Sequence, residues 1–331
     1  MRKPTRARKP LISVVLSFFN EENVIPELIR RLRKAFEGTD CDHELVFVND
    51  ASTDRSYQIL VEAAGEQDDI RILTTSRNFG HMPCIYAGVE AAQGDAVIYM
   101  DADLQDPPEL IPEMIRAWKS EDDIDVVYTT RTHRDGEGFF KLLITNLGYR
   151  ILKYTSNINI ALNSGDFRLL SRRAVDEFLK FKEKKPFFRF LVSWIGFKQK
   201  QVFYRREARY DGKTKFPFGT KVITQFLEIS LVPFSDLPLR FSLLLGFLTS
   251  FCSFLYLIGV VVMKACDMNL PGWSAIMAGM LFLGGVQLVV TGMQGLYVGA
   301  IYNEVRGRPN FIIRDWFGFE AAPGQRAAAN A

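Results

Sequence analysis

Short apolar runs alternate with amphipathic segments along the first two thirds of the chain. Five of the runs are rich in aliphatic and β-branched residues and predict strands at 11–18, 44–49, 70–75, 96–101 and 125–130. The segments between them have helical spacing, several with a polar cap or an early proline, and predict helices at 23–36, 54–64, 81–92 and 108–119. Strands that alternate with helices of this length predict an α/β fold with a mostly parallel sheet covered on both faces.

The last third of the chain carries two long stretches without charge, at 241–263 and 268–303. Each exceeds the roughly 20 apolar residues that cross a hydrocarbon core, and we expect spans at about 241–263 and 273–302. The short polar connection between them predicts a two-helix transmembrane hairpin. Arginines flanking the pair outnumber the single lysine of the turn. The first two thirds of the chain and both termini are therefore expected on the cytoplasmic side of an inner or plasma membrane.

Composition narrows the classes of partner. A net charge of +3 over 331 residues is too small to indicate a nucleic acid. The four cysteines show no CxxC or histidine-linked metal spacing, so reduced thiols are expected. The basic first ten residues do not lead into the apolar region and cleavage site of a signal peptide, and they read as a disordered arm.

These patterns divide the chain into five parts. We expect a basic arm at 1–10, a cytosolic domain at 11–216, interfacial juxtamembrane helices at 217–239, the hairpin at 240–303 and a cytosolic tail at 304–331. Two segments, 138–154 and 184–197, are rich in aromatic and basic residues, and they suit either a membrane interface or ordinary helices packed on the sheet. The pattern Gly295-Leu296-Tyr297-Val298-Gly299 allows close helix packing, within one chain or in a homo-oligomer.

Polar side chains gather where the predicted strands end, at Asn20-Glu21, Asn49-Asp50 and Asp101-Ala102-Asp103. In open parallel sheets, ligands bind at the carboxyl ends of the strands. Asp101 and Asp103 are two residues apart on an extended segment, so their side chains face the same way. A Mg²⁺ site needs only one or two protein carboxylates beside waters and phosphate oxygens. A solvated turn is the alternative explanation of this spacing.

Four motifs at the strand ends follow one another in order. They are Ser17-Phe18-Phe19-Asn20-Glu21, Val48-Asn49-Asp50-Ala51-Ser52-Thr53-Asp54, Arg77-Asn78-Phe79-Gly80 and Asp101-Ala102-Asp103-Leu104-Gln105-Asp106-Pro107-Pro108. Together they resemble family-2 glycosyltransferases of the GT-A, Rossmann-like fold. Gly165-Asp166-Phe167-Arg168-Leu169, the segment 209–216, the hairpin and residues 306–309 narrow the resemblance to polyprenyl-phosphate glycosyltransferases. That group includes the bactoprenol glucosyltransferases and dolichol-phosphate mannose synthase, and the resemblance covers about residues 10–320.

The resemblance implies a role for each motif residue. Asp103 would bind Mg²⁺ or Mn²⁺, with Asp101 either a second ligand or a neighbour at the ribose. The residues implied in nucleotide-sugar binding are Asn20, Glu21, Asp50, Arg77, Asp101 and Gln105. Asp166 would act as a general base or orient the acceptor, with capping or pairing to Arg168 as its structural alternative. Arg131, Arg209 and Lys215 would bind phosphate groups, because two approaching phosphates repel one another and need cations between them.

Two residues depart from the family's pattern. Asn49 stands where many members carry an aspartate, so Asp50 alone would accept a hydrogen bond from the base. Ala51 replaces the usual glycine of that turn, which predicts a backbone conformation open to non-glycine residues.

The resemblance further implies a membrane enzyme that acts on a nucleotide sugar and a polyprenyl phosphate lipid. The expected reaction is an inverting, metal-dependent hexosyl transfer, with UDP-glucose and undecaprenyl phosphate as the favoured pair and GDP-mannose as the alternative donor. A processive synthase is disfavoured because the chain has no Gln-x-x-Arg-Trp element, and a transporter because it would need more spans. The rival from another class is a non-catalytic, nucleotide-sugar-binding partner of a flippase.

Overall fold

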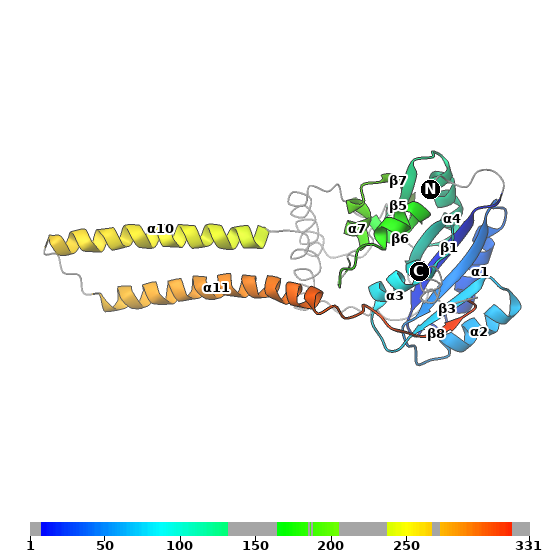
Figure 1. Cartoon of the computed structure of the whole chain (residues 1–331), viewed down its shortest axis with the longest axis horizontal. Coiled ribbons are helices and arrows are strands. Elements are labelled where there is room, and N and C mark those ends of the chain that lie inside the picture. The colour runs from blue at the N-terminus through cyan, green and yellow to red at the C-terminus, as the bar shows by residue number, and fades with distance from the viewer. Residues whose placement is uncertain are drawn as a thin grey trace, which may run out of the picture. The chain divides into compact units, whose positions relative to one another are not determined.

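The computed structural model of the chain describes residues 8–131, 164–184, 186, 188–204, 237–266 and 272–319 (Figure 1). The chain forms two units, of which the first contains a sheet with its helices and the second a pair of long helices. Segment 138–154, for which both interpretations were left open, and residues 217–236 of the expected juxtamembrane helices lie outside the described residues.

Within the described residues, eight strands form one mixed sheet in the order β7-β5-β6-β4-β1-β2-β3-β8. Neighbours are parallel at β1/β2, β1/β4, β2/β3 and β5/β7, and antiparallel at β4/β6, β5/β6 and β3/β8. The bounds are β1 Leu11–Phe18, β2 Asp42–Asn49, β3 Ile70–Thr75, β4 Ala96–Asp101, β5 Ile124–Arg131, β6 Ser164–Ser171, β7 Lys198–Tyr204 and β8 Ile313–Phe317. The prediction of a mostly parallel sheet is confirmed, and the five predicted strands correspond to β1–β5.

The four predicted helices are also present. The helices of the sheet unit are α1 Ile25–Phe36, α2 Ser56–Glu66, α3 His81–Ala91, α4 Ile111–Lys119, α6 Arg172–Phe178 and α7 Phe188–Trp194. The helix predicted at 108–119 is divided, because a 3₁₀ turn, η1 Pro108–Leu110, precedes α4. Pro112 has no N–H to donate to the carbonyl group of residue 108, so a continuous α-helix cannot form there.

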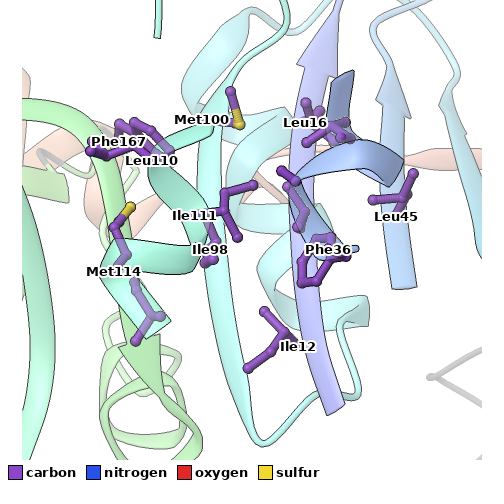
Figure 2. Close-up of a cluster of buried hydrophobic side chains, with 14 of the residues drawn as sticks. Ile12, Leu16, Phe36, Leu45, Ile98, Met100, Leu110, Ile111, Met114 and Phe167 are labelled. Atoms are coloured by element: carbon purple, nitrogen blue, oxygen red, sulfur yellow. The ribbon is translucent and has the colours of Figure 1, made fainter. Parts of the chain in front are cut away.

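Helices cover both faces of the sheet. Ile12, Val14 and Leu16 of β1 belong to a buried cluster that also contains the apolar residues of α1 and α4 (Figure 2). Successive side chains of a strand point to opposite faces, and Val15 accordingly lies against Gly88 of α3. The expected two-sided covering of the sheet is therefore observed.

Gly88 determines how closely α3 approaches the sheet. A Cβ atom at this position would lie 2.9 Å from Cγ2 of Val48 and closer still to Cγ1 of Val15. Protein interiors have no spare volume for such a group without rearrangement. Glycine at this position thus permits the helix that begins at His81 to rest directly on two central strands.

We expect Gly88→Ala to lower the free energy of unfolding by roughly 1–3 kcal/mol, because the added methyl group must displace buried valine side chains. The matched control is Gly65→Ala in α2, where a Cβ atom would have no neighbour within 4 Å. That variant should be more stable by about 0.5–1 kcal/mol, because alanine is the better helix former. Thermal unfolding of the purified protein measures both, and equal shifts would contradict the close packing of α3.

Within the segment 184–197, the described residues include α7, which packs on the sheet. In α7, Phe188, Phe190, Leu191 and Val192 are buried, and the ring of Phe188 packs edge-on against Tyr99 of β4 at 5.7 Å between centroids. Of the two interpretations that the sequence left open, the helix packed on the sheet is the one observed.

The tail predicted at 304–331 contains a strand that the sequence pattern did not indicate. β8 pairs antiparallel with β3 at the edge of the sheet. Just before it, the amide group of Asn310 donates to the carbonyl oxygen of Glu183 at 2.8 Å, and the N–H of Ser76 donates to the carbonyl oxygen of Ile312 at 2.9 Å. The chain after the long helices therefore returns to the sheet, and residues 308–319 of the expected cytosolic tail belong to the sheet unit.

The described residues of the second unit form a helical hairpin. Its helices, α10 Leu237–Ala265 and α11 Trp273–Val305, lie side by side and antiparallel (Figure 1). Oγ of Ser242 in α10 lies 2.9 Å from Sδ of Met293 in α11. Both helices are long and apolar enough to cross a membrane, over Leu239–Met263 and Ile276–Val305, which agrees with the predicted pair of spans.

Candidate functional site

The carboxyl ends of β1, β2 and β4 lie level with one another. Parallel pairing places Ser17 of β1 beside Asp101 of β4, and Phe18 of β1 beside Asn49 of β2. The polar motifs that follow these strands are therefore neighbours in space, as the sequence predicted.

The loop after β1 is fastened to the loop after β2. Asn20 has the left-handed backbone conformation, with φ 55°, which asparagine tolerates better than most residues. Its Oδ1 accepts from the N–H of Thr53 at 2.8 Å, and its own N–H donates to Oγ of Ser52 at 3.0 Å. The N–H of Glu21 donates to Oγ of Ser56 at 2.9 Å. Asn20 and Glu21 therefore hold the two loops together, and their direct contact with a nucleotide sugar stays a prediction.

The turn after β2 differs from our expectation. Ala51 has φ 57°, in the left-handed region that favours glycine, so the prediction of a conformation open to any residue is wrong. Asn49 supports this turn, because its Oδ1 accepts from the N–H of Ser52 at 2.9 Å. The hydrogen bonds that Ser52 makes with Asn49 and Asn20 keep Ala51 in this strained conformation.

Replacing Ala51 with glycine should raise the free energy of unfolding by about 0.5–1 kcal/mol. The left-handed conformation costs a residue with a Cβ atom roughly 1–2 kcal/mol, and the greater backbone entropy of glycine cancels part of the gain. Chemical denaturation gives the change. Ala63→Gly, inside α2, is the control and should destabilise the protein by about 1 kcal/mol. A loss of stability in both variants would contradict the strain assigned to Ala51.

Asp50 shapes the loop that carries Arg77. Its side chain is buried, with Oδ1 accepting from the N–H of Phe79 at 2.7 Å and Oδ2 from the N–H of Gly80 at 2.8 Å. Arg77 is exposed, stacks its guanidinium group over the ring of Phe79 at 3.9 Å and donates to the carbonyl oxygen of Asn78 at 2.9 Å. Asp50 is therefore committed to main-chain amides, and the contact that we expected between Asp50 and a base stays a prediction.

His81, the first residue of α3, joins the ends of β1 and β4. Its Nδ1 lies 2.5 Å from Oγ of Ser17, and its Nε2 lies 3.1 Å from Oδ1 of Asp101. The sequence analysis did not select this histidine. The available signal was its position directly after the motif Arg77-Asn78-Phe79-Gly80, at the start of a predicted helix.

The loop after β4 presents Asp103 on a strained turn. Oδ1 of Asp103 accepts from the N–H of Gln105 at 3.1 Å, and Leu104 between them has φ 60°. Asp106 is fully buried, and the hydroxyl group of Tyr204 in β7 donates to its Oδ1. This loop is therefore fixed at one end by β4 and at the other by β7.

Carboxylates are concentrated around Asp101. Burial raises the pKa of Asp101 to about 6; His81 acts in the opposite direction, and Asp106, Asp166 and Asp103 add to the rise. Among the described residues, no group of three or more His, Cys, Asp or Glu side chains forms a complete metal site. Two carboxylates are nevertheless enough for Mg²⁺ when phosphate oxygens supply further ligands.

Asp166 of β6 faces a guanidinium group from α7. Nε and Nη2 of Arg189 donate to its two oxygens at 2.7 and 2.6 Å. Burial alone would raise the pKa of Asp166, but Arg189, Arg168 and His81 outweigh it and hold the pKa at about 2. Asp166 is thus ionised at neutral pH, and its pairing partner is Arg189, which the sequence analysis did not identify.

Of the three remaining predicted site residues, the structure describes only Arg131. Arg131 is the last residue of β5, at the same edge as Tyr204 of β7 according to the strand register. Arg209 and Lys215 lie outside the described residues. Their proposed contacts with phosphate groups stay predictions.

Asp101→Asn should stabilise the ligand-free protein at pH 8 by about 1–2 kcal/mol. The pKa of Asp101 is raised, so folding disfavours its ionised form above about pH 6. Towards pH 4 the carboxyl group is protonated in the folded protein, and the gain should disappear. This gain is smaller than the full effect of the pKa shift, because the side chain is 30% exposed and solvent screens its charge.

Melting temperatures at pH 8 and pH 4 test this expectation. Asp122→Asn, on the exposed turn before β5, is the control and should change neither value. An equal gain for Asp101→Asn at both pH values would show that ionisation of Asp101 is not the cause.

Acidic side chains at the carboxyl ends of a mostly parallel sheet are typical of α/β enzymes that bind nucleotides and their sugars. Residues 13–179 match the model of Glycosyl transferase family 2. The uncharacterized glycosyltransferase YkcC of Bacillus subtilis (strain 168) is 43% identical over 309 residues, which cover 93% of this chain and 94% of that relative. The SfII prophage-derived bactoprenol glucosyl transferase of Shigella flexneri is 36% identical over 304 residues, 92% of this chain and 97% of that relative. The chain belongs to glycosyl transferase family 2 and is a glycosyltransferase.

Proposed function

We propose that the protein transfers a hexose from a nucleotide sugar to a polyprenyl phosphate, with UDP-glucose and undecaprenyl phosphate as the favoured pair. The observation that carries this proposal is the similarity to the bactoprenol glucosyl transferase of Shigella flexneri. It extends over 92% of this chain and so includes the helical hairpin as well as the sheet. The acidic strand ends supply the chemistry that such a donor requires.

The strand-end carboxylates fit a divalent cation. Burial and neighbouring carboxylates disfavour ionised Asp101, and a bound cation would favour it. We assign Mg²⁺ or Mn²⁺ to Asp103 and Asp101; when bound, the ion would neutralise negative charge on the leaving diphosphate. The surrounding residues that we assign to the nucleotide sugar, by contact or by support of the loops, are Asn20, Glu21, Asp50, Arg77 and Gln105.

In the proposed reaction, an oxygen of the lipid phosphate attacks C1 of the hexose. The bond between C1 and the diphosphate oxygen breaks, its electron pair leaves with the nucleoside diphosphate, and the configuration at C1 inverts. A phosphate monoester is largely a dianion at neutral pH, so it needs aiming more than deprotonation. Ionised Asp166, paired with Arg189, is suited to orienting the acceptor rather than to removing a proton.

Cations are needed where the two phosphate groups approach each other. Arg131, Arg209 and Lys215 are the side chains that we assign to this role, because guanidinium and ammonium groups neutralise phosphate charge. For the membrane topology, we propose that the sheet unit and both termini are cytoplasmic. Two spans return the chain to its side of origin, and β8 after the hairpin joins the sheet that precedes it.

A donor screen tests the proposal. Purified full-length protein is given radiolabelled UDP-glucose, GDP-mannose or other nucleotide sugars with polyprenyl phosphate and Mg²⁺ or Mn²⁺. We expect one donor, UDP-glucose, to give a labelled lipid. Asp103→Asn should reduce the rate by at least about 100-fold, because a lost metal contact removes several kcal/mol of charge stabilisation.

Asp122→Asn, the same substitution on an exposed turn, should retain the wild-type rate. Labelling from GDP-mannose alone would replace glucose with mannose in the proposal. No labelled lipid with any donor would contradict the transferase reaction and favour a protein that only binds nucleotide sugars.

A further inference from the structure

His81 touches two residues that the strand register places side by side. Ser17 and Asp101 are paired across β1 and β4, and the imidazole ring contacts both, with Nδ1 at 2.5 Å from the hydroxyl oxygen and Nε2 at 3.1 Å from the carboxylate. The ring is 38% exposed and Asp101 is 30% exposed, whereas Ser17 is buried. The histidine thus stands at the boundary between the core and the open edge of the sheet.

The two contacts are chemically compatible with one tautomer of a neutral ring. Nε2–H can donate to Asp101 while Nδ1 accepts from the hydroxyl group of Ser17. This arrangement holds the ring at both nitrogens. It also fixes Oδ1 of Asp101, and among the described residues no hydrogen bond is made by the other carboxylate oxygen, which can therefore meet a ligand.

Several features of the fold determine where this ring lies. Asp50 binds the N–H groups of Phe79 and Gly80, immediately before His81. Gly88 allows the helix behind His81 to rest on Val15 and Val48. The start of α3 is therefore fixed from both sides, and the imidazole ring is supported independently of Asp101.

We infer that His81 is a positioning residue for donor binding: it holds the carboxylate of Asp101 in the orientation that a nucleoside diphosphate and its divalent cation require. This inference rests on the proposed function, because it assumes that the donor occupies the strand ends. Removing a residue that hydrogen-bonds to a metal-binding carboxylate or imidazole group commonly weakens the affinity for the metal 10- to 100-fold. His81 acts through Asp101 and has no reacting atom of its own in this role.

The two ring nitrogens can be separated by substitution. Glutamine carries its amide nitrogen near the position of Nε2, so His81→Gln can keep the donor to Asp101. Asparagine carries its amide group near Nδ1, so His81→Asn can keep only the side facing Ser17. If His81 acts through Asp101, the glutamine variant should bind the donor more tightly than the asparagine variant. If His81 only links α3 to β1, the asparagine variant should bind it more tightly.

Isothermal titration calorimetry measures the affinity of the full-length protein in detergent for UDP in the presence of MnCl₂. We expect His81→Ala and His81→Asn to weaken UDP binding about 10-fold or more, and His81→Gln to remain within about 3-fold of the wild type. The control is His43→Gln. His43 lies 3.4 Å from a carboxylate of Asp69, at the start of β2 away from the site, and this variant should bind UDP as the wild type does.

Equal affinities for the glutamine and asparagine variants, or better binding by asparagine, would overturn the role of His81. So would unchanged binding by His81→Ala. Should the alanine variant fail to fold in a melting experiment, the comparison of the two amides still decides. A wild-type protein that binds neither UDP nor GDP would instead overturn the proposed function, and the inference with it.

Discussion

The parallel register of β1, β2 and β4 is the constraint on which the rest of the site depends. It brings Ser17 beside Asp101 and sets the loops after all three strands at one edge. A slip of one residue would exchange the faces to which the β4 side chains point and move Asp101 away from Ser17, because side chains alternate along a strand. The apolar residues that fill both faces of the sheet resist such a slip, so packing far from the edge determines where the carboxylates emerge.

Burying a carboxylate at this edge is unfavourable for the folded protein unless positive charge lies beside it. The raised pKa of Asp101 and the lowered pKa of Asp166 show two responses to the same burial: one group lacks sufficient positive charge, and the other has Arg189 and Arg168 beside it. The first is suited to receiving a cation, the second to remaining ionised without one. The strained conformations of Ala51 and Leu104 occur in the loops of the same edge, as is common where binding rather than stability selects the backbone.

Local patterns predicted most of the sheet unit, and long-range contacts account for what they missed. The apolar runs of β1 to β5 are continuous because these strands are buried, so they were visible in the sequence. β8 contains Arg314 and Asp315 and forms only because β3 offers an unpaired edge. The roles of His81 and Arg189 come from contacts with Asp101 and Asp166, which are distant in sequence. For His81 the only local signal was its position after the motif Arg77-Asn78-Phe79-Gly80. Alanine at position 51 predicts a negative φ, but the hydrogen bonds of the neighbouring loops impose a positive one, which the residue type alone does not reveal.

The return of the chain to the sheet has a consequence for how the protein can sit in a membrane. β8 follows the hairpin, whereas β1 to β7 precede it, yet all belong to one sheet. Under the proposed topology, both connections of the hairpin lead to the same unit, which requires an even number of spans between them. The Ser76–Ile312 hydrogen bond lies one residue before Arg77, so the returning segment also supports the start of the loop that Asp50 shapes. An odd number of spans would separate β8 from β3 and leave that loop without this support.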